Sequence, residues 1–289
     1  MDRIGVKMGI EFAMDNRFHG RYGQAAFRKL YEQGFRYVDV GMIDTDMPLY
    51  QMTEEEATLY LDGVRRLATE SGVGISQVHG PWRYPPRDFE EVDREERFSS
   101  MSRSIHLCAL LGVKYWVVHP IMPFGTEDMD LGKEAETYRM NIDFMRRLVE
   151  VARREGVVIC YENMPFTRFS LSTPEQIMRV VEEIDDEHFC VCLDTGHVNV
   201  FPELSVADAV RRIGSKLRVL HIHDNLGDRD AHLWPTEGTI DWSAFKTALD
   251  EIGFEGVYSL ETLPKGELSD EEFFVQGRRL FEVAERLFA

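Results

Sequence analysis

The chain has 289 residues, which is enough for one large domain or for two ordinary ones. Its composition, 44% hydrophobic and 29% charged, predicts a globular protein with a large core, and no run approaches the ~20 apolar residues of a transmembrane helix. Acidic residues outnumber basic ones 51 to 33, and the formal net charge of -18 argues against nucleic acid as a partner, because an extended nucleic-acid surface needs clustered Lys and Arg.

The N-terminal sequence and the cysteines bear on the cellular compartment. Residues 1–10 show no basic flank followed by a long apolar run, so we expect no signal peptide. The four cysteines, Cys108, Cys160, Cys190 and Cys192, form no zinc-type C-x2-C pair, and three of them lie in apolar, strand-like runs. We interpret them as buried free thiols, and we expect a soluble, cytoplasmic protein without membrane contact.

Short apolar runs alternate along the chain with longer segments whose apolar residues recur near the helical period. The predicted strands are 8–14, 37–42, 74–79, 115–120, 157–163, 189–194, 217–223 and 256–262. The predicted helices are 23–33, 53–70, 91–111, 132–155, 173–184, 205–213, 241–252 and 270–287.

Several of these boundaries carry recognisable capping residues. Thr53 and Thr173 precede acidic first turns, as N-caps do, and a glycine follows five of the helices: Gly34, Gly72, Gly112, Gly156 and Gly253. Strict alternation of strand and helix implies parallel strands with right-handed crossovers. Eight such units without a linker predict the α/β class, as a single (β/α)8 TIM barrel and one domain over residues 1–289.

Ionisable side chains gather where the predicted strands end. Strands 3 to 8 close on His79, His119, Glu162, Asp194, His221 and Glu261 in turn. Residues two apart share a face of a strand, so these side chains should point inward together, while alternating apolar residues such as Val78, Ile159 and Leu220 should pack against the helices. Loop residues His197, Asp230 and His232 follow close behind.

One His or Glu at a strand end is more often a hydrogen-bonding group than a metal ligand. Six strand ends that converge are different, because unpaired buried carboxylates are costly and a cation relieves them. Imidazole with carboxylate suits zinc or manganese, and also iron or cobalt, whereas magnesium prefers oxygen ligands alone. We therefore predict one or more divalent metal ions at the C-terminal ends of the strands.

The same residues resemble the xylose-isomerase-like barrel superfamily, which holds sugar isomerases and epimerases together with apurinic endonucleases of the endonuclease-four type. The matching segments span about two-thirds of the chain: VHGPW (78–82), VVHP (117–120), YENMP (161–165), LDTGHVN (193–199), HIHDN (221–225), DAHLWPTEGTIDW (230–242) and SLET (259–262). The pattern is specific for the superfamily and much less specific for a reaction.

The resemblance implies a role for each ionisable position. Glu162, Asp194, His221 and Glu261 would hold the metal that epimerases and endonucleases share. In the endonucleases, two further zinc ions use the equivalents of His79 and His119, and of His197, Asp230 and His232, so these five positions hold either more metal or substrate here. His223 and Asp224 would orient a ligand or order the loop rather than bind the metal.

The first functional interpretation is an isomerase or epimerase acting on a keto-sugar or sugar phosphate through a metal-stabilised enediolate. By the resemblance, Glu162 and Glu261 would remove and return the proton. Trp82 and Trp234 offer apolar faces to a sugar, and Arg83 and Arg168 are candidates for binding a phosphate. A homodimer is the general expectation for an enzyme of this size.

Two alternatives stay open. Ketose 3-epimerases of the superfamily usually carry a Glu and an Arg at positions occupied here by Arg168 and Gly227, so a lyase or dehydratase acting on a sugar or polyol derivative also fits. An apurinic endonuclease with three zinc ions fits the nine ligand positions. However, its ENxxG signature is replaced by ENMP, and Arg17 and Arg21 lie in loops without a basic-aromatic run.

Overall fold

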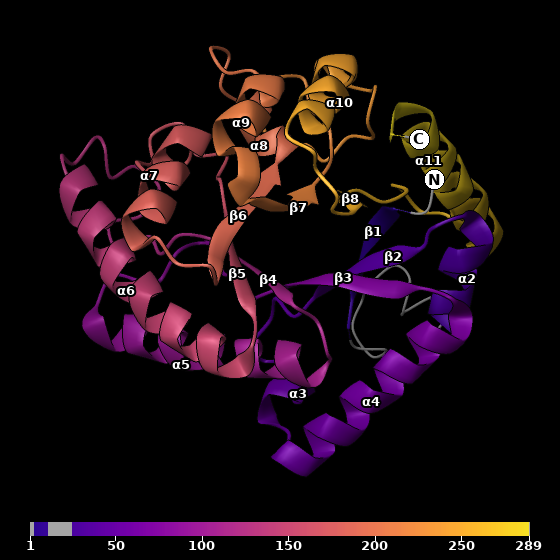
Figure 1. Cartoon of the computed structure of the whole chain (residues 1–289), viewed down its shortest axis with the longest axis horizontal. Helices are drawn as coiled ribbons and strands as arrows, with labels where there is room; N and C mark the ends of the chain where they lie inside the picture. Colours follow the sequence, from indigo (N-terminus) through magenta and orange to yellow (C-terminus); the bar gives the residue numbers. More distant parts are fainter. Residues whose placement is uncertain (1–2, 11–24, 289) are drawn as a thin grey trace.

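Eight parallel strands form a single barrel with helices around it (Figure 1). The computed structural model describes residues 3–10 and 25–288; the predictions for residues 11–14 and 23–24, together with Arg17 and Arg21, lie outside these ranges. Neighbouring strands pair in sequence order, and β1 also pairs with β8. The barrel closes where Ile222, just after β7, bridges Leu260 of β8. The predicted (β/α)8 fold is therefore confirmed.

The observed strands lie close to the predicted ones, except for the first. They are β1 (Ile4–Gly9), β2 (Tyr37–Gly41), β3 (Gly74–His79), β4 (Tyr115–Val118), β5 (Val158–Glu162), β6 (Phe189–Asp194), β7 (Leu217–His221) and β8 (Tyr258–Leu260). The prediction of 8–14 for the first strand was wrong because Lys7 interrupts the apolar run of residues 4–10. The side chain of Lys7 is only partly exposed and forms an ion pair with Glu261, so a charged residue occupies a position in the strand.

The helices also follow the predicted ranges, within one or two residues wherever both ends are described. They are α2 (Ala26–Gln33), α4 (Glu54–Ser71), α5 (Glu91–Leu110), α6 (Glu134–Glu155), α7 (Pro174–Ile184), α9 (Val206–Ile213), α10 (Trp242–Glu251) and α11 (Asp270–Phe288). Thr53 and Thr173 form the expected N-terminal capping boxes. Three short elements were not predicted: α3 (Pro48–Gln51), α8 (Thr195–Asn199) and the 3-10 turn η2 (Gly214–Lys216).

The alternation of side chains along the strands separates two apolar clusters. Residues predicted to face outward, including Val78, Ile159 and Leu220, are buried in the main core between the barrel and its helices. A smaller cluster of Val117, Val158, Cys160, Cys190, Cys192 and Val219 is separate from that core, as expected for side chains pointing into the barrel. All four cysteines are buried and free, as expected.

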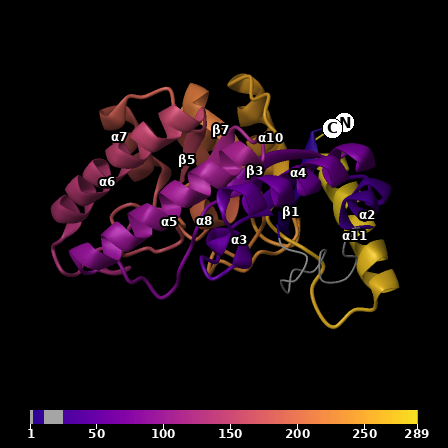
Figure 2. The same cartoon turned by 90° about the horizontal axis from the view of Figure 1, so that it is seen from below.

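The loops that follow the strands lie at one end of the barrel. Figure 1 looks roughly along the barrel axis, and in Figure 2 the short helices α3 and α8, which follow β2 and β6, lie towards the same end of the molecule. In a barrel of this kind the C-terminal ends of the strands carry the functional site. Within the described ranges, no helix is long and apolar enough to cross a membrane.

Asp88 ties together the loops after β3 and β4. Its carboxylate is fully buried and accepts hydrogen bonds from Arg97 Nη1 at 2.6 Å, Arg83 Nη2 at 3.0 Å and the backbone N–H of Met122 at 3.0 Å. Since Arg97 is only 4% exposed, the pair is a buried salt bridge whose two charges depend on each other.

Replacing Asp88 with Ala should lower the free energy of unfolding by about 3–5 kcal/mol, because the change leaves the Arg97 charge buried without its partner. Glu96→Ala is the matched control, since that exposed carboxylate pairs with Arg83 at the surface and should contribute about 1 kcal/mol or less. Urea unfolding of the two variants measures the difference. Equal losses would show that the Asp88 network does not stabilise the loops.

Candidate metal centre

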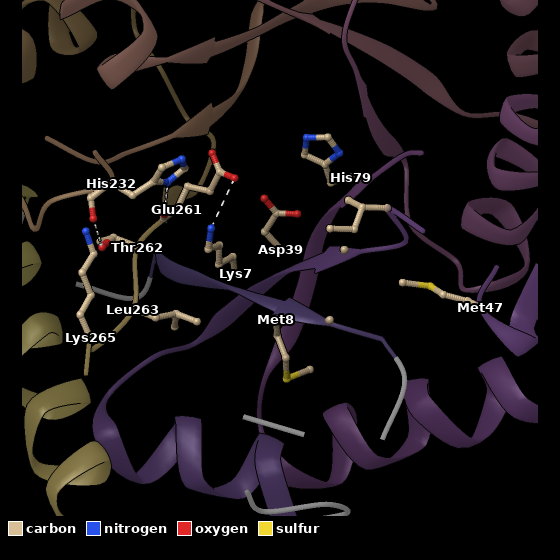
Figure 3. A pocket seen from close by; sticks show the side chains of 13 residues that line it. Lys7, Met8, Asp39, Met47, His79, His232, Glu261, Thr262, Leu263 and Lys265 are labelled. Atoms are coloured by element: carbon tan, nitrogen blue, oxygen red, sulfur yellow. Dashed lines mark hydrogen bonds and ion pairs between the residues drawn. The ribbon is translucent and has the colours of Figure 1, made fainter. Parts of the chain in front are cut away.

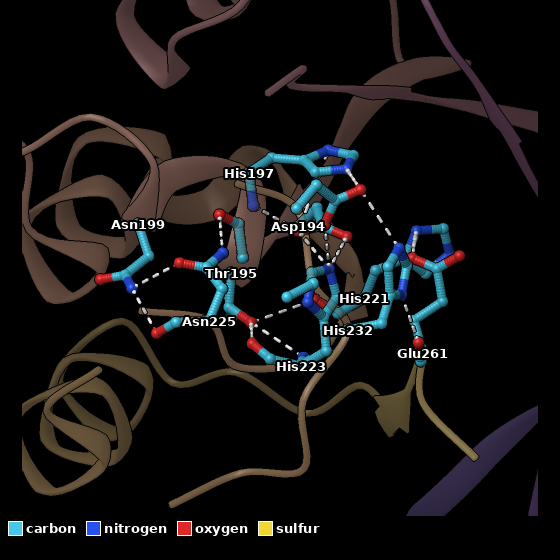
Figure 4. A network of polar contacts seen from close by, with 12 residues as sticks. Asp194, Thr195, His197, Asn199, His221, His223, Asn225, His232 and Glu261 are labelled. Atoms are coloured by element: carbon cyan, nitrogen blue, oxygen red, sulfur yellow. Dashed lines mark hydrogen bonds and ion pairs between the residues drawn. The ribbon is translucent and has the colours of Figure 1, made fainter. Parts of the chain in front are cut away.

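Four ionisable side chains meet at the C-terminal ends of the last four strands, and three of them, Asp194, His221 and Glu261, are labelled in Figure 4. Glu162 ends β5, Asp194 ends β6, His221 ends β7, and Glu261 follows β8. One ligand atom from each lies within 4.8 Å of the corresponding atoms of the other three. Glu162, Asp194 and His221 are at most 1% exposed, so their charges are almost fully removed from water.

His221 lies between two carboxylates that hold its ring in place. Its Nδ1 donates to Glu162 Oε1 at 2.7 Å and lies 3.4 Å from Glu261 Oε2. Its Nε2 lies 2.9 Å from Asp39 Oδ2, and Gln77 Nε2 donates to the same oxygen at 3.0 Å. Nδ1 is therefore the atom that faces the other candidate ligands, and Nε2, on the opposite side of the ring, faces Asp39 as an ion pair without hydrogen-bond geometry.

The sequence analysis missed Asp39. It lies on β2 in the run YVDVG and is 3% exposed. A carboxylate in the middle of an otherwise apolar strand is the signal that would have found it, because such a group needs a partner inside the protein.

His79 and His119 approach Glu162 from β3 and from the residue after β4. Their Nε2 atoms lie 3.5 Å and 2.9 Å from Glu162 Oε2. That oxygen is buried and has no hydrogen-bond partner among the described residues. His79 Nδ1 donates to the carbonyl of Gly80 at 2.9 Å, which leaves Nε2 directed at the carboxylate.

The loop residues His197, Asp230 and His232 also come together. The two histidines each donate a hydrogen bond from Nδ1 to a backbone carbonyl. His197 donates to the carbonyl of Asn163 at 2.8 Å, and His232 donates to that of Glu261 at 2.7 Å. Their Nε2 atoms lie 3.4 Å and 3.2 Å from Asp230 Oδ2. The structure therefore brings together all nine positions at which ligands were expected.

His223 was expected to orient a ligand rather than bind metal, but it lies among the candidate ligands themselves: it groups with Asp194 and His197, and with His232 and Glu261. Its Nε2 lies 3.1 Å from Asp194 Oδ1 and 3.4 Å from Asp230 Oδ1, and its ring stacks on His232 with centroids 4.0 Å apart. Gly196 makes this possible, because a Cβ there would lie 1.9 Å from His223 Cε1.

The neighbouring Asp224 orders the loop after β7, as expected. Its carboxylate accepts hydrogen bonds from the backbone N–H groups of Thr236 and Ile240 and from Trp242 Nε1.

The donor set fits a divalent transition metal. His79, His197 and His232 each anchor Nδ1 on a carbonyl and direct Nε2 at a carboxylate, which is how a metal-binding imidazole is usually oriented. Glu162 Oε2 and Asp230 Oδ1 are buried acceptors without a hydrogen bond in the part of the chain that is described. Mixed imidazole and carboxylate ligands suit zinc or manganese.

The pKa shifts of the clustered carboxyls and imidazoles also fit a site for a divalent cation. Burial opposes charge on Glu162 and Glu261, but the neighbouring His221 outweighs it, and the pKa of both carboxyls lies well below the ordinary value. Burial also opposes charge on the histidines. Even so, nearby negative groups including Glu162 raise the pKa of His221 well above its usual value, and Asp194 and Asp230 raise the pKa of His197 to about 10. In the absence of a metal ion, protonated imidazoles such as those of His221 and His197 offset the negative charge of the carboxylates.

Two adjoining cavities open at this centre. The metal cavity, about 430 Å³, is lined by the candidate ligands Glu162 and Glu261, His79, His119, His197, Asp230 and His232, and by Trp82, Tyr84 and Phe166 on its wall. The second cavity, about 420 Å³, lies beside it and shares Lys7, Ile43, His79, His232 and Glu261 (Figure 3). Both volumes fall in the range of small-molecule sites, roughly 300–1,000 Å³.

Only one of the four residues expected to bind substrate lines these cavities. Trp82 does. Arg83 pairs with Asp88 and Glu96, Arg168 pairs with Asp130 and is 59% exposed, and Trp234 lies at a separate surface depression with its Nε1 donating to the Leu263 carbonyl. Their loops were correctly placed at this end of the barrel, but a sequence does not reveal which way a loop side chain turns.

Comparisons with known proteins identify a family and a set of similar folds. The profile of the family described as xylose isomerase-like TIM barrel matches residues 27–280. An uncharacterized protein, MJ1311, from Methanocaldococcus jannaschii is 35% identical over 123 residues, 42% of each chain. Inosose isomerase from Bacillus subtilis is 28% identical over 179 residues, which cover 60% of this chain and 62% of that enzyme.

Among solved structures, a D-tagatose 3-epimerase-like protein superposes with a TM-score of 0.74 at 22% sequence identity, covering 98% of this chain and 96% of the other. At this identity the match supports the fold. This chain spans less than two-thirds of the length of each of the two curated relatives.

Binding of zinc or manganese should release protons at pH 7, because a metal ligand must be neutral imidazole and the pKa of His221 and His197 is raised in the metal-free protein. Affinity should therefore rise with pH between 6 and 8. Calorimetry in buffers of different ionisation enthalpy counts the protons. His106→Gln is the control, since this histidine pairs with Glu54 and Glu155 on outer helices. Metal binding without proton release would contradict the proposed ligand set.

Proposed function

Because the chain belongs to the xylose isomerase-like TIM barrel family, we propose that it is a divalent-metal-dependent isomerase or epimerase of a keto-sugar or sugar phosphate. The observation that carries the proposal is the meeting of Glu162, Asp194, His221 and Glu261 beside a cavity large enough for a sugar. The name of the related inosose isomerase supports the same class of reaction.

Moving a proton next to a carbonyl needs a base and a means of stabilising the negative charge that forms. A divalent ion held by Glu162, Asp194, His221 and Glu261 would supply Lewis-acid stabilisation of the enediolate. Zinc and manganese both fit these ligands.

Glu162 and Glu261 are the proposed acid–base pair. Their pKa values lie well below the ordinary range, so both are ionised at neutral pH and can accept a proton. Glu162 ends β5 and Glu261 follows β8, so the two carboxylates reach the centre from different strands of the barrel. One carboxylate would take the proton from carbon, and either the same group or the other would return it.

Other residues of the chain would orient the sugar and exclude water. Trp82, Tyr84 and Phe166 form an aromatic wall of the metal cavity, and Trp82 packs edge-on against His119 at 4.3 Å between ring centroids. Flat apolar faces of this kind pack against the C–H faces of a sugar ring. His197 and His232 direct their Nε2 atoms into the same cavity, where they can contact substrate oxygens or a further metal ion.

The convergence of all nine ligand positions also fits the trinuclear zinc centre that the resemblance implies for apurinic endonucleases. The net charge of -18 weighs against a DNA substrate, because binding its backbone requires Lys and Arg. Arg83 and Arg168, the two arginines predicted to bind a phosphate, form ion pairs away from the metal cavity. Isomerase or epimerase chemistry is therefore the conclusion.

Solvent-deuterium incorporation, followed by NMR across ketoses and ketose phosphates with manganese present, tests the proposal. At least one substrate should exchange a proton on the carbon next to its carbonyl. Glu261→Gln should slow the exchange by roughly 10²–10⁴-fold, the usual contribution of a general base. Glu271→Gln on the exposed face of α11 should leave it unchanged.

Two results would count against this function. The first is the absence of exchange in every ketose and ketose phosphate, accompanied by incision of an oligonucleotide containing an abasic site. The second is exchange at the same rate in the Glu261→Gln variant, which would remove that carboxylate from the reaction.

A further inference from the structure

The aromatic wall of the metal cavity extends to the protein surface. Trp82, Tyr84 and Phe166 all line the cavity, yet Tyr84 is 65% exposed. Its ring lies nearly parallel to that of Phe166, at an interplanar angle of 12° with the centroids 5.9 Å apart, and at 25° and 6.4 Å to that of Trp82. We call these three rings the aromatic platform. Because Tyr84 is more than half exposed beside two aromatic neighbours, the platform continues from the cavity into solvent.

The residues that precede Tyr84 are anchored to other loops. The backbone N–H of Trp82 donates to the carbonyl of Ile43 at 3.0 Å, which connects the loop after β3 to the loop after β2. Arg83 Nη2 lies 3.0 Å from Oδ1 of the fully buried Asp88. These contacts fix the backbone on the β3 side of the platform, so the exposed ring stands on an ordered loop.

Phe166, on the loop after β5, is anchored in a similar way. Its carbonyl accepts hydrogen bonds from Ser172 Oγ at 2.7 Å and from the backbone N–H of Phe169 at 3.1 Å. Two loops from different parts of the chain therefore present a preformed aromatic surface. Binding a ligand on such a surface costs little free energy for ordering the loops.

The lining of the metal cavity is of two kinds. One part consists of the ionisable side chains of the candidate metal centre together with Lys7. The other part is apolar and consists of Ile43, Trp82, Tyr84, Met164, Pro165 and Phe166. The keto end of a sugar belongs at the ionisable part, because the enediolate forms beside the metal.

A single sugar does not account for the whole apolar part. The cavity volume, about 430 Å³, is that of sites which hold drug-sized ligands. A six-carbon ketose is smaller than such a ligand, and with its carbonyl at the metal centre it leaves the exposed end of the platform, at Tyr84, uncovered. A substrate that extends beyond one sugar unit would cover that ring.

We propose that the substrate is a ketose joined to a second sugar ring, and that the second ring packs on Tyr84 and Phe166 while the keto end reaches the metal centre. This inference rests on the proposed function, and it narrows the substrate class to keto-disaccharides and related glycosides. One face of a sugar ring carries C–H groups that pack on an aromatic face, and its hydroxyl edge stays hydrated. A fully apolar substituent on this half-exposed surface would leave part of itself in water.

The test compares the affinity of the manganese-loaded protein for D-fructose with its affinity for ketoses that carry a second ring, measured by calorimetry. The probes are turanose, lactulose and isomaltulose, in which a hexose ring is attached to a different oxygen of D-fructose, and 6-O-methyl-D-fructose, which has an ether but no second ring. At least one disaccharide should bind roughly 5-fold or more tightly than D-fructose and its methyl ether, the scale of one ring packed on an aromatic face. Tyr84→Ala should remove this preference.

Two further variants separate the ring from its hydroxyl and from the loop. Tyr84→Phe keeps the ring and should keep the preference. Phe89→Ala is the matched control, because Phe89 lies in the same loop, is 52% exposed and is not among the described residues that line the two cavities. The preference should be unchanged in that variant. Thermal melting with metal analysis verifies that each variant folds and binds manganese.

The inference is overturned if no disaccharide binds more tightly than D-fructose, or if Tyr84→Ala weakens the binding of D-fructose and of the disaccharides by the same factor. These outcomes are separable from failure of the proposed function. Deuterium exchange in monosaccharide ketoses without a Tyr84-dependent preference removes the inference and keeps the function. Tyr84-dependent binding of a disaccharide, with no exchange in any ketose, keeps the site for the second ring and removes the enolisation.

Discussion

The cost of burying carboxylates without enough positive charge is the constraint on which the site depends. Glu162 and Asp194 are almost fully removed from water, and Asp39 lies just below them in the barrel. An isolated buried carboxylate costs several kcal/mol, so each needs a cation or a proton on a neighbour. The pKa of His221 and of His197 is raised by the carboxylates around them, so these imidazoles favour the protonated form, and a divalent ion can take the place of such protons.

The barrel fold holds the carboxylates and imidazoles close enough together for one divalent ion to replace the protons. Parallel strands bring their C-terminal ends to one rim, and the period of two directs every second side chain inward. The carbonyls of Gly80, Asn163 and Glu261 then fix three imidazole rings from the side away from the candidate ligands, and Asp39 forms an ion pair with His221. The strands and the first residues after them therefore orient the side chains of the candidate ligands. The longer loops form the wall of the metal cavity.

The sequence predicted the barrel and most of the centre because both follow from local patterns. Alternation of apolar residues located seven of the eight strands, and acids and histidines at their ends located the ligands. Lys7 and Asp39 were missed because each is a charged residue inside a strand, where a periodicity argument expects an apolar or small one. Arg83, Arg168 and Trp234 were placed in the right loops, but their side chains turn towards Asp88, Asp130 and the Leu263 carbonyl. Asp130 and Leu263 lie far in sequence from Arg168 and Trp234, so local patterns do not reveal these partners.

Anomalous X-ray scattering from crystals of the manganese-loaded protein tests the central claim most directly. A metal ion bound at the proposed centre should give a peak at roughly 2.0–2.3 Å from a ligand atom of each of Glu162, Asp194, His221 and Glu261, with His221 binding through Nδ1. Further peaks beside His79 and His119, or among His197, Asp230 and His232, would count the additional ions. Manganese bound elsewhere, with no peak among these four side chains, would contradict the assignment of the metal centre.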